Sequence, residues 1–164
     1  IQVLNDDGDP ANVGNVGELA VASPYCFSGY HNLAEETAKS KKGDWFITGD
    51  LARVDEEGYL YIVDRKNDMI ITGGENVYPR EVEEVLLTHP SVSECAVVGI
   101  PHEYWGEEVN AFVVLKPNAK TTFEELDGFC RLQLSKYKTP KKIKFTSDLP
   151  RNSMGKILRR KLRD

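Results

Sequence analysis

The sequence predicts an α+β fold in two parts, a strand-rich first part and a second part in which a short sheet is flanked by helices. Short apolar runs separated by Gly, Asp and Asn fill residues 1–66, a pattern typical of strands joined by turns. Residues 67–164 add segments with helical spacing of apolar residues and recognisable helix starts. The length of 164 residues and the apolar content of 40% are enough for packed cores.

The first part is expected to be mostly β. Its strands are expected at Ile1–Leu4, Gly17–Ala22, Trp45–Thr48, Leu51–Val54 and Tyr59–Val63. The acidic turn Asp55–Gly58 predicts a hairpin between the last two of these strands. Because the sequence opens on a strand and not on a methionine, we expect this part to be the incomplete end of a larger N-terminal domain.

A charged segment, Asp64–Asp68, separates the two parts, and we expect the boundary near Asn67. A new apolar run starts after this segment, at Met69. The expected domains are therefore residues 1–66 and residues 67–164, and the second has the usual size of a compact domain.

Local signals predict where the helices of the second part begin. Pro79 suits the first turn of a helix that extends to Thr88. Thr122 and Glu125 have the spacing of a capping box, which predicts a helix start. Leu158 and Leu162, four residues apart, predict a short terminal helix with basic outer faces. Strands are expected in the run from Met69 and at Ser93–Ile100, Val109–Leu115 and Lys142–Thr146.

Positive charge is concentrated near the end of the sequence. The net charge is -5, yet the segment from Lys136 to Arg163 holds eleven Lys and Arg residues against one acid, Asp148. A basic surface favours an anionic partner. Composition leaves three classes open: a nucleic acid, a phosphorylated cofactor and an acidic neighbouring domain.

The cysteines and the hydropathy pattern exclude several protein classes. Cys26, Cys95 and Cys130 are far apart and form no Cys-x-x-Cys pair, so we expect reduced structural thiols and no metal site. No apolar run approaches the roughly 20 residues that span a bilayer, and no leader peptide opens the sequence. We therefore expect a cytoplasmic protein without a transmembrane segment.

Two polar positions in the first part are candidates for nucleotide binding. Asp50, after the expected strand that ends at Thr48, carries a carboxylate that can accept hydrogen bonds from two neighbouring hydroxyls, as ribose requires. Arg65 has a planar guanidinium that can bind ribose or phosphate oxygens. The structural alternatives are a common strand ending at Asp50 and a salt bridge within Asp64-Arg65.

Two glycine-containing loops in the second part are further candidates. In Thr72–Asn76, adjacent glycines between a strand and a helix let backbone approach a narrow ligand, although a plain turn explains them equally well. The segment is not Gly-x-Gly-x-x-Gly, so a dinucleotide fingerprint is not supported. Lys156 follows Gly155 in a polar loop, where its ammonium can reach an anion or simply face solvent.

Taken together and in order, these motifs resemble the superfamily of AMP-forming acyl-CoA synthetases, peptide-synthetase adenylation domains and firefly luciferases. The resemblance extends from Gly17 to Lys161 and identifies the chain as a C-terminal fragment. Within the superfamily it favours fatty-acid or aryl-acid CoA ligases. The matching motifs are Gly17-Glu18-Leu19, Trp45 ahead of Thr48–Leu51, Asp64-Arg65, Gly73–Pro79 and Gly155-Lys156.

The resemblance implies a two-step reaction. Members of the family join a carboxylic acid to ATP, which releases pyrophosphate and leaves an acyl-adenylate, and then transfer the acyl group to the thiol of CoA. By similarity, Asp50 and Arg65 bind the nucleotide. Lys156 is the catalytic residue of the first step, because it matches the lysine that reaches the substrate carboxylate and the α-phosphate.

The resemblance also implies CoA contacts and a hinge. Gly73, Gly74 and Trp105 match positions beside the pantetheine arm of CoA. Asn67 matches the pivot about which the small, mobile domain rotates, so that a different face serves each half-reaction. The family usually has Asp or Lys at this position, and an amide tolerates unusual backbone angles.

The phosphate-gripping loop and the acid-binding pocket of this family lie upstream of the matching region. We therefore expect the chain to act together with its own missing N-terminal domain, which would hold most of the Mg²⁺ site, and to be inactive alone. The alternatives are a small nucleic-acid-binding module, based on Tyr137 and Phe145 in the basic stretch, and a non-catalytic scaffold derived from a ligase. We expect no nucleic-acid partner.

Overall fold

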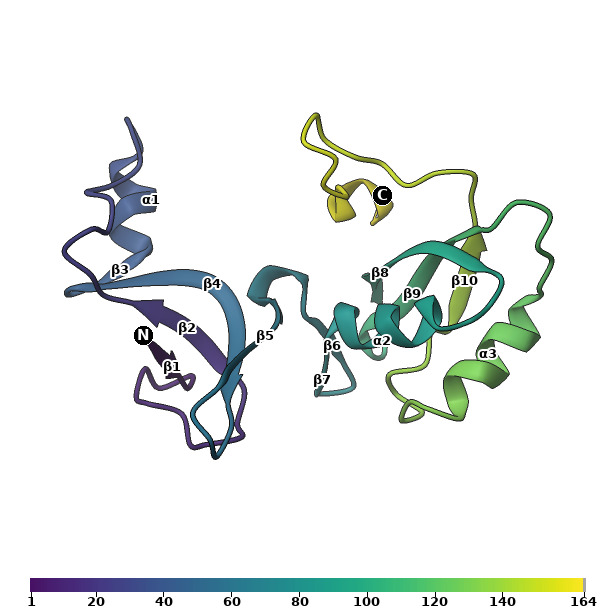
Figure 1. Ribbon diagram of the computed structural model, residues 1–164, viewed down its shortest axis with the longest axis horizontal. Helices are drawn as coiled ribbons and strands as arrows, with labels where there is room; N and C mark the ends of the chain where they lie inside the picture. Colours follow the sequence, from purple (N-terminus) through teal and green to yellow (C-terminus); the bar gives the residue numbers. More distant parts are fainter. Residues whose placement is uncertain (164) are drawn as a thin grey trace. The chain divides into compact units, whose positions relative to one another are not determined.

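The computed structural model describes residues 1–163, and the chain divides into two compact units, Ile1–Asn67 and a second unit that begins at Asp68 (Figure 1). Each unit contains one sheet and at least one helix, so the α+β prediction is confirmed. The second unit begins at Asp68, one residue later than the expected start of the second domain at Asn67. Among residues 1–163, no helix is long and apolar enough to cross a membrane.

The first unit is an antiparallel sheet in the order β1-β2-β4-β3, with β5 paired to β4. Its small core contains Val3, Leu19 and Ala52, which come from β1, β2 and β4. A short helix with no buried residues, α1 (Ala34–Lys39), precedes β3. The strands are β1 (Gln2–Leu4), β2 (Gly17–Val21), β3 (Lys41–Lys42), β4 (Trp45–Val54) and β5 (Leu60–Arg65).

Two expectations about these strands were wrong. The expected pair of strands on either side of Gly49 is the single strand β4, because β2 pairs with residues at both of its ends. Asp50 therefore lies within a strand and not after one. The hairpin at Asp55–Gly58 is confirmed, but β5 continues to Arg65, since Leu51 and Asp50 extend the ladder opposite Asp64 and Arg65.

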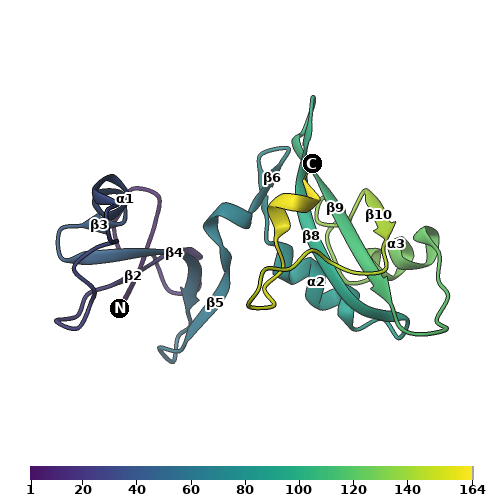
Figure 2. The same cartoon turned by 90° about the horizontal axis from the view of Figure 1, so that it is seen from above.

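The second unit has a sheet in the order β10-β9-β6-β7, with β8 paired along the length of β9 (Figure 2). Two helices, α2 (Pro79–Leu87) and α3 (Phe123–Arg131), share one core with this sheet. Leu86 of α2 and Leu126 of α3 are fully buried there. The strands are β6 (Ile70–Thr72), β7 (Glu75–Val77), β8 (Val92–His102), β9 (Gly106–Leu115) and β10 (Lys142–Phe145), and a short 3₁₀ helix, η2 (Arg159–Leu162), follows them. Another 3₁₀ helix, η1 (Lys66–Asp68), includes the last two residues of the first unit and the first residue of the second.

The helix starts of the second unit follow the local signals. Pro79 occupies the first turn of α2. The capping box of α3 is present, because the Thr122 hydroxyl accepts from the Glu125 amide at 3.3 Å and the Glu125 carboxylate accepts from the Thr122 amide at 3.2 Å. The expected terminal helix is a 3₁₀ helix, η2. Leu158 is the N-terminal cap of this helix, and the Leu158 carbonyl accepts a hydrogen bond from the Lys161 amide.

Cys95 and Cys130 are buried free thiols in the core of the second unit, and Cys26 is a partly exposed free thiol in the first. Burial raises the pKa of the Cys95 thiol to about 12, and the nearby Glu83 carboxylate adds to this shift. Burial likewise raises the pKa of the Cys130 thiol to about 11. Since the thiolate is the reactive form, both core cysteines are chemically inert in the folded chain.

We predict that iodoacetamide at pH 8 modifies Cys26 well before Cys95 or Cys130. The two core thiols have high pKa values and stay protonated, and their burial keeps the reagent away from them. Mass spectrometry of tryptic peptides measures the order of modification. In guanidinium chloride all three should react at similar rates, and native modification of Cys95 or Cys130 as fast as Cys26 would contradict the prediction.

Candidate functional site

The two residues expected to bind a nucleotide lie directly opposite each other on neighbouring strands. Asp50 of β4 pairs in register with Arg65 of β5. Arg65 Nε lies 2.9 Å from Asp50 Oδ1, and its Nη1 donates to the Thr48 carbonyl at 3.4 Å. The side chains are 51% exposed for Arg65 and 29% for Asp50. The salt bridge of Arg65 is thus made with Asp50, while Asp64 accepts a hydrogen bond from the Arg65 amide.

Gly49 sets the backbone path that brings this pair together. Its φ of 74° lies in the left-handed region, which a residue with a Cβ adopts only with strain. The next amide, that of Asp50, donates to the Thr48 hydroxyl at 3.0 Å. The Thr48-Gly49-Asp50 segment therefore fixes the start of the Asp50 side chain by local hydrogen bonding.

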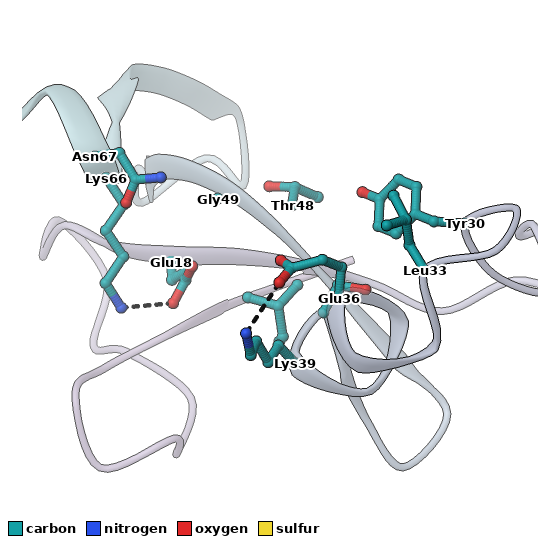
Figure 3. A pocket seen from close by; sticks show the side chains of 11 residues that line it. Glu18, Tyr30, Leu33, Glu36, Lys39, Thr48, Gly49, Lys66 and Asn67 are labelled. Carbon is teal, nitrogen blue, oxygen red and sulfur yellow. Dashed lines mark hydrogen bonds and ion pairs between the residues drawn. The ribbon is translucent and has the colours of Figure 1, made fainter. Parts of the chain in front are cut away.

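A pocket of about 600 Å³ lies beside this segment in the first unit (Figure 3). Lys66, the chain neighbour of Arg65, projects toward it and its ammonium contacts the Glu18 carboxylate at 2.7 Å. Neither Lys66 nor Glu18 was expected to line a site, although Glu18 lies in the motif Gly17-Glu18-Leu19 and Lys66 directly follows Asp64-Arg65. The other lining residues are Tyr30, Leu33, Glu36, Lys39, Ser40, Ile47, Thr48, Gly49 and Asn67.

The glycine turn of the second unit connects two strands, β6 and β7, and not a strand and a helix as expected. The residues after the glycines, Glu75–Val77, pair back onto β6 before α2 begins. Gly73 has φ of 60°, and its amide donates to the Trp105 carbonyl at 2.9 Å. A Cβ on Gly73 would lie 3.0 Å from the Trp105 ring, so the indole packs directly against this glycine.

A second pocket, of about 380 Å³, adjoins the Gly73 turn and the Trp105 ring. Burial alone would raise the pKa of the Glu108 carboxyl in its wall, but hydrogen bonds from Lys142 and Asn110 outweigh burial and lower that pKa. Glu108 is therefore an ionised and already paired group. Lys136 and Lys141, which also line this pocket, were not expected here from the sequence. The lining residues are Thr72, Gly73, Glu75, Trp105, Glu108, Lys136, Tyr137 and Lys141.

Lys156 is exposed at the end of a tight loop that precedes η2. The Asn152 side-chain oxygen accepts from the amides of Met154 and Lys156, at 3.0 and 2.9 Å. Arg151 donates to the Gly155 carbonyl at 2.7 Å. The loop backbone is thus held in one shape, while the Lys156 ammonium makes no ion pair within residues 1–163.

The loop before η2 and the β6-β7 hairpin lie on different sides of the second unit in both Figures 1 and 2. The first carries Lys156, and the second carries the Gly73 turn that Trp105 covers. The two features therefore belong to separate surfaces of one compact unit. The roles expected for these residues remain predictions.

Comparison with known proteins gives consistent relatives for almost the whole chain. Residues 81–156 match the family described as AMP-binding enzyme C-terminal domain. A 2-succinylbenzoate–CoA ligase of Geobacillus kaustophilus is 49% identical over 157 residues, which are 96% of this chain and 32% of the relative. A long-chain-fatty-acid–CoA ligase of Bacillus subtilis is 52% identical over 146 residues, or 89% of this chain and 26% of the relative. The chain spans about a third or less of the length of these curated relatives.

Solved structures give the same result. ATP-bound MatB from Rhodopseudomonas palustris superposes with a TM-score of 0.93 at 41% identity, over 99% of this chain and 33% of that one. The o-succinylbenzoate CoA synthetase MenE from Bacillus subtilis, in complex with its acyl-adenylate intermediate, superposes with a TM-score of 0.92 at 40% identity and the same coverage.

We predict that Gly73→Ala and Gly74→Ala differ in their effect on Trp105. Both glycines have positive φ, so each substitution should destabilise the fold by about 1–2 kcal/mol. Only the new methyl at position 73 meets the indole, since a Cβ at position 74 would enter open space. Tryptophan fluorescence in a Trp45→Phe background should shift for Gly73→Ala alone. An equal shift in both variants would contradict the packing of Trp105 on Gly73.

Proposed function

Because the chain belongs to the AMP-binding enzyme family, as a C-terminal portion, we propose that the full-length protein is an AMP-forming carboxylic acid:CoA ligase for fatty or aryl acids. The proposal depends chiefly on one observation: a rigid loop presents the exposed Lys156 on one surface, and a glycine turn under Trp105 forms another. Each surface suits one step of a two-step reaction.

In the first step, the carboxylate oxygen of the acid attacks the α-phosphorus of ATP, and pyrophosphate leaves. Negative charge grows on the oxygens around that phosphorus. The exposed ammonium of Lys156, which makes no ion pair with residues 1–163, is well suited to stabilise this charge, an effect typically worth a few kcal/mol in the transition state. The loop that holds Lys156 through Asn152 fixes its backbone in advance, so little reorganisation is needed.

In this proposal, Asp50 and Arg65 bind the nucleotide and hold it in position. The exposed pair offers a carboxylate acceptor next to a guanidinium donor, the combination that ribose hydroxyls and neighbouring oxygens require. Their roles are to bind and orient, since their charges already pair with each other.

In the second step, the thiol sulfur of CoA attacks the acyl carbonyl, and AMP leaves as the acyl–phosphate bond breaks. The turn at Gly73 and Gly74 offers bare backbone beside the Trp105 indole, which suits the narrow pantetheine arm of CoA. Asn67 is the last residue of the first unit. It would act as the pivot about which the second unit rotates, so that each of its two surfaces in turn faces the bound nucleotide. Residues outside this chain would bind the acid and most of the Mg²⁺.

The nucleic-acid alternative is disfavoured because much of the basic stretch is already paired. Several of its cations contact acids of earlier elements and are not free to neutralise phosphates. Its aromatic residues Tyr137 and Phe145 are only about 40% exposed. The pairs are Lys138 with Glu81, Lys142 with Glu108, Arg151 with Glu94, and Arg159 with Glu83.

We predict that Lys156→Ala in the full-length protein lowers acid-dependent ATP–pyrophosphate exchange to a small residual rate, a loss of at least about a hundredfold. Thioester formation from supplied acyl-adenylate should stay within about threefold of wild type, because that step uses the other surface. Lys161→Ala, which removes an exposed lysine of η2, is the matched control. Equal loss of both steps would refute the assigned role, and no exchange by the wild type with any acid would favour a non-catalytic scaffold.

We further predict that Asp50→Asn raises the KM for ATP by about tenfold or more while leaving the fold intact. The Asp50–Arg65 pair is partly exposed, so its loss should lower the free energy of unfolding by less than about 1 kcal/mol. Initial rates and urea unfolding measure the two effects. An unchanged KM, or a loss of ATP affinity that only follows loss of stability, would count against nucleotide binding by Asp50.

A further inference from the structure

Arg159, in the basic stretch, uses its guanidinium to contact several other elements of the second unit. Its guanidinium forms a two-pronged pair with the Glu83 carboxylate, with Nη2 3.0 Å from Oε2 and Nη1 in contact with Oε1. Nη1 also donates to the Val97 carbonyl at 3.1 Å. Only 20% of the Arg159 side chain and 12% of the Glu83 side chain are exposed. Arg159 therefore fastens η2 to both α2 and β8.

Glu83 has a second donor in the same place. Its Oε1 accepts from the Val97 amide at 2.7 Å, so this carboxylate receives both the guanidinium and a backbone N–H. A carboxylate buried to this degree depends on its partners, and removal of the arginine would leave it largely uncompensated. The pair is thus a structural element and differs from the exposed ion pairs elsewhere on the surface.

The other side of Arg159 faces the start of the second unit. Its Nε lies 3.5 Å from Asp68 Oδ2, and Arg163 Nη2 lies 3.8 Å from Asp68 Oδ1. Asp68 directly follows Asn67, the last residue of the first unit. One arginine therefore touches three segments that are distant in sequence: the residue after the expected pivot, the middle of α2, and β8.

Only two residues separate Arg159 from Lys156. The intervening Ile157 forms a bridge with Arg151, and the Leu158 amide donates to the Pro150 carbonyl at 2.8 Å. The loop that presents Lys156 is thus closed on itself and attached to the rest of the unit immediately behind its last residue. Where Arg159 is held, the Lys156 backbone has little freedom to move.

We infer that Arg159, held by Glu83 and Asp68, is a positioning residue for the Lys156 loop. Its contacts with Glu83, Val97 and Asp68, called the seat below, attach this loop to α2, to β8 and to the residue after Asn67. The catalytic consequence rests on the proposed function: the Lys156 ammonium reaches the reacting phosphate only when Arg159 holds the loop in place. The glycine turn lies elsewhere on the unit, so the thioester step does not need this seat. Arg159 itself does not touch substrate in this role.

The seat can be tested without any activity, by hydrogen exchange of the full-length protein measured by mass spectrometry. Arg159→Gln and Glu83→Gln should each speed exchange of the amides in residues 157–163 by about tenfold or more, because both release η2 from α2. Arg160→Gln, which removes the adjacent exposed cation, should leave these rates within about twofold. Unchanged exchange in Arg159→Gln and Glu83→Gln would overturn the inference.

Activity then tests whether the seat acts through Lys156. Arg159→Gln should lower kcat for ATP–pyrophosphate exchange by about tenfold or more, and Arg159→Lys should retain an intermediate rate. Thioester formation from supplied acyl-adenylate should stay within about twofold. In a Lys156→Ala background, adding Arg159→Gln should cause no further loss, since residues that act as one unit are not additive. Equal loss of both steps, or an additive double variant, would overturn the inference.

The two proposals fail in different ways. If the wild type catalyses no pyrophosphate exchange with any acid, the proposed function fails, while the hydrogen-exchange comparison still decides whether Arg159 seats the loop. If Arg159→Gln does not fold, as judged by urea unfolding, Glu83→Gln and Arg159→Lys provide the same comparison with smaller changes. Wild-type rates of hydrogen exchange and of both reaction steps in Glu83→Gln and Arg159→Lys would overturn the inference.

Discussion

The antiparallel pairing of β8 with β9 is the interaction on which the second unit depends. The ladder runs from Val92 opposite Leu115 to His102 opposite Gly106. Buried residues of these two strands pack in one core with α2 and α3. In β8, the Val97 amide donates to Glu83 and the Val97 carbonyl accepts from Arg159. Its turn delivers Trp105 to the glycine hairpin. Both candidate surfaces of this unit therefore depend on one pair of strands.

Electrostatics in the second unit give a different picture from its composition. The excess of lysine and arginine near the end of the sequence suggests a surface for anions. In the fold, acids from earlier elements take up many of these cations, and the pair between Arg159 and Glu83 is largely buried. Lys156 differs from these residues because its charge is exposed and makes no ion pair in the described part of the chain. Cations that hold the fold, such as Arg159, are thus distinct from exposed cations such as Lys156.

Short-range signals in the sequence predicted much of this structure. The proline at the start of α2 and the capping box of α3 act within a single turn, so their effect can be recognised without knowledge of the fold. The continuity of β4 through Gly49 could not be recognised, because it depends on pairing with β2. The strand β7 is short and polar, and α1 buries nothing, so neither has an apolar pattern. The partners of Asp50, Gly73 and Arg159 also come from distant segments, and spacing along the chain carries no information about them.

The strand β10 has a consequence for how the chain reaches this arrangement. It pairs parallel to β9, with Lys142 opposite Asn110 and Phe145 opposite Val113. Parallel neighbours cannot be joined by a tight turn, and here the crossover contains α3. Closing so long a connection carries an entropic cost that local hairpins avoid. We therefore expect the segment beyond β10, which includes the exposed Lys156, to be placed by a non-local pairing that forms later than the local hairpins.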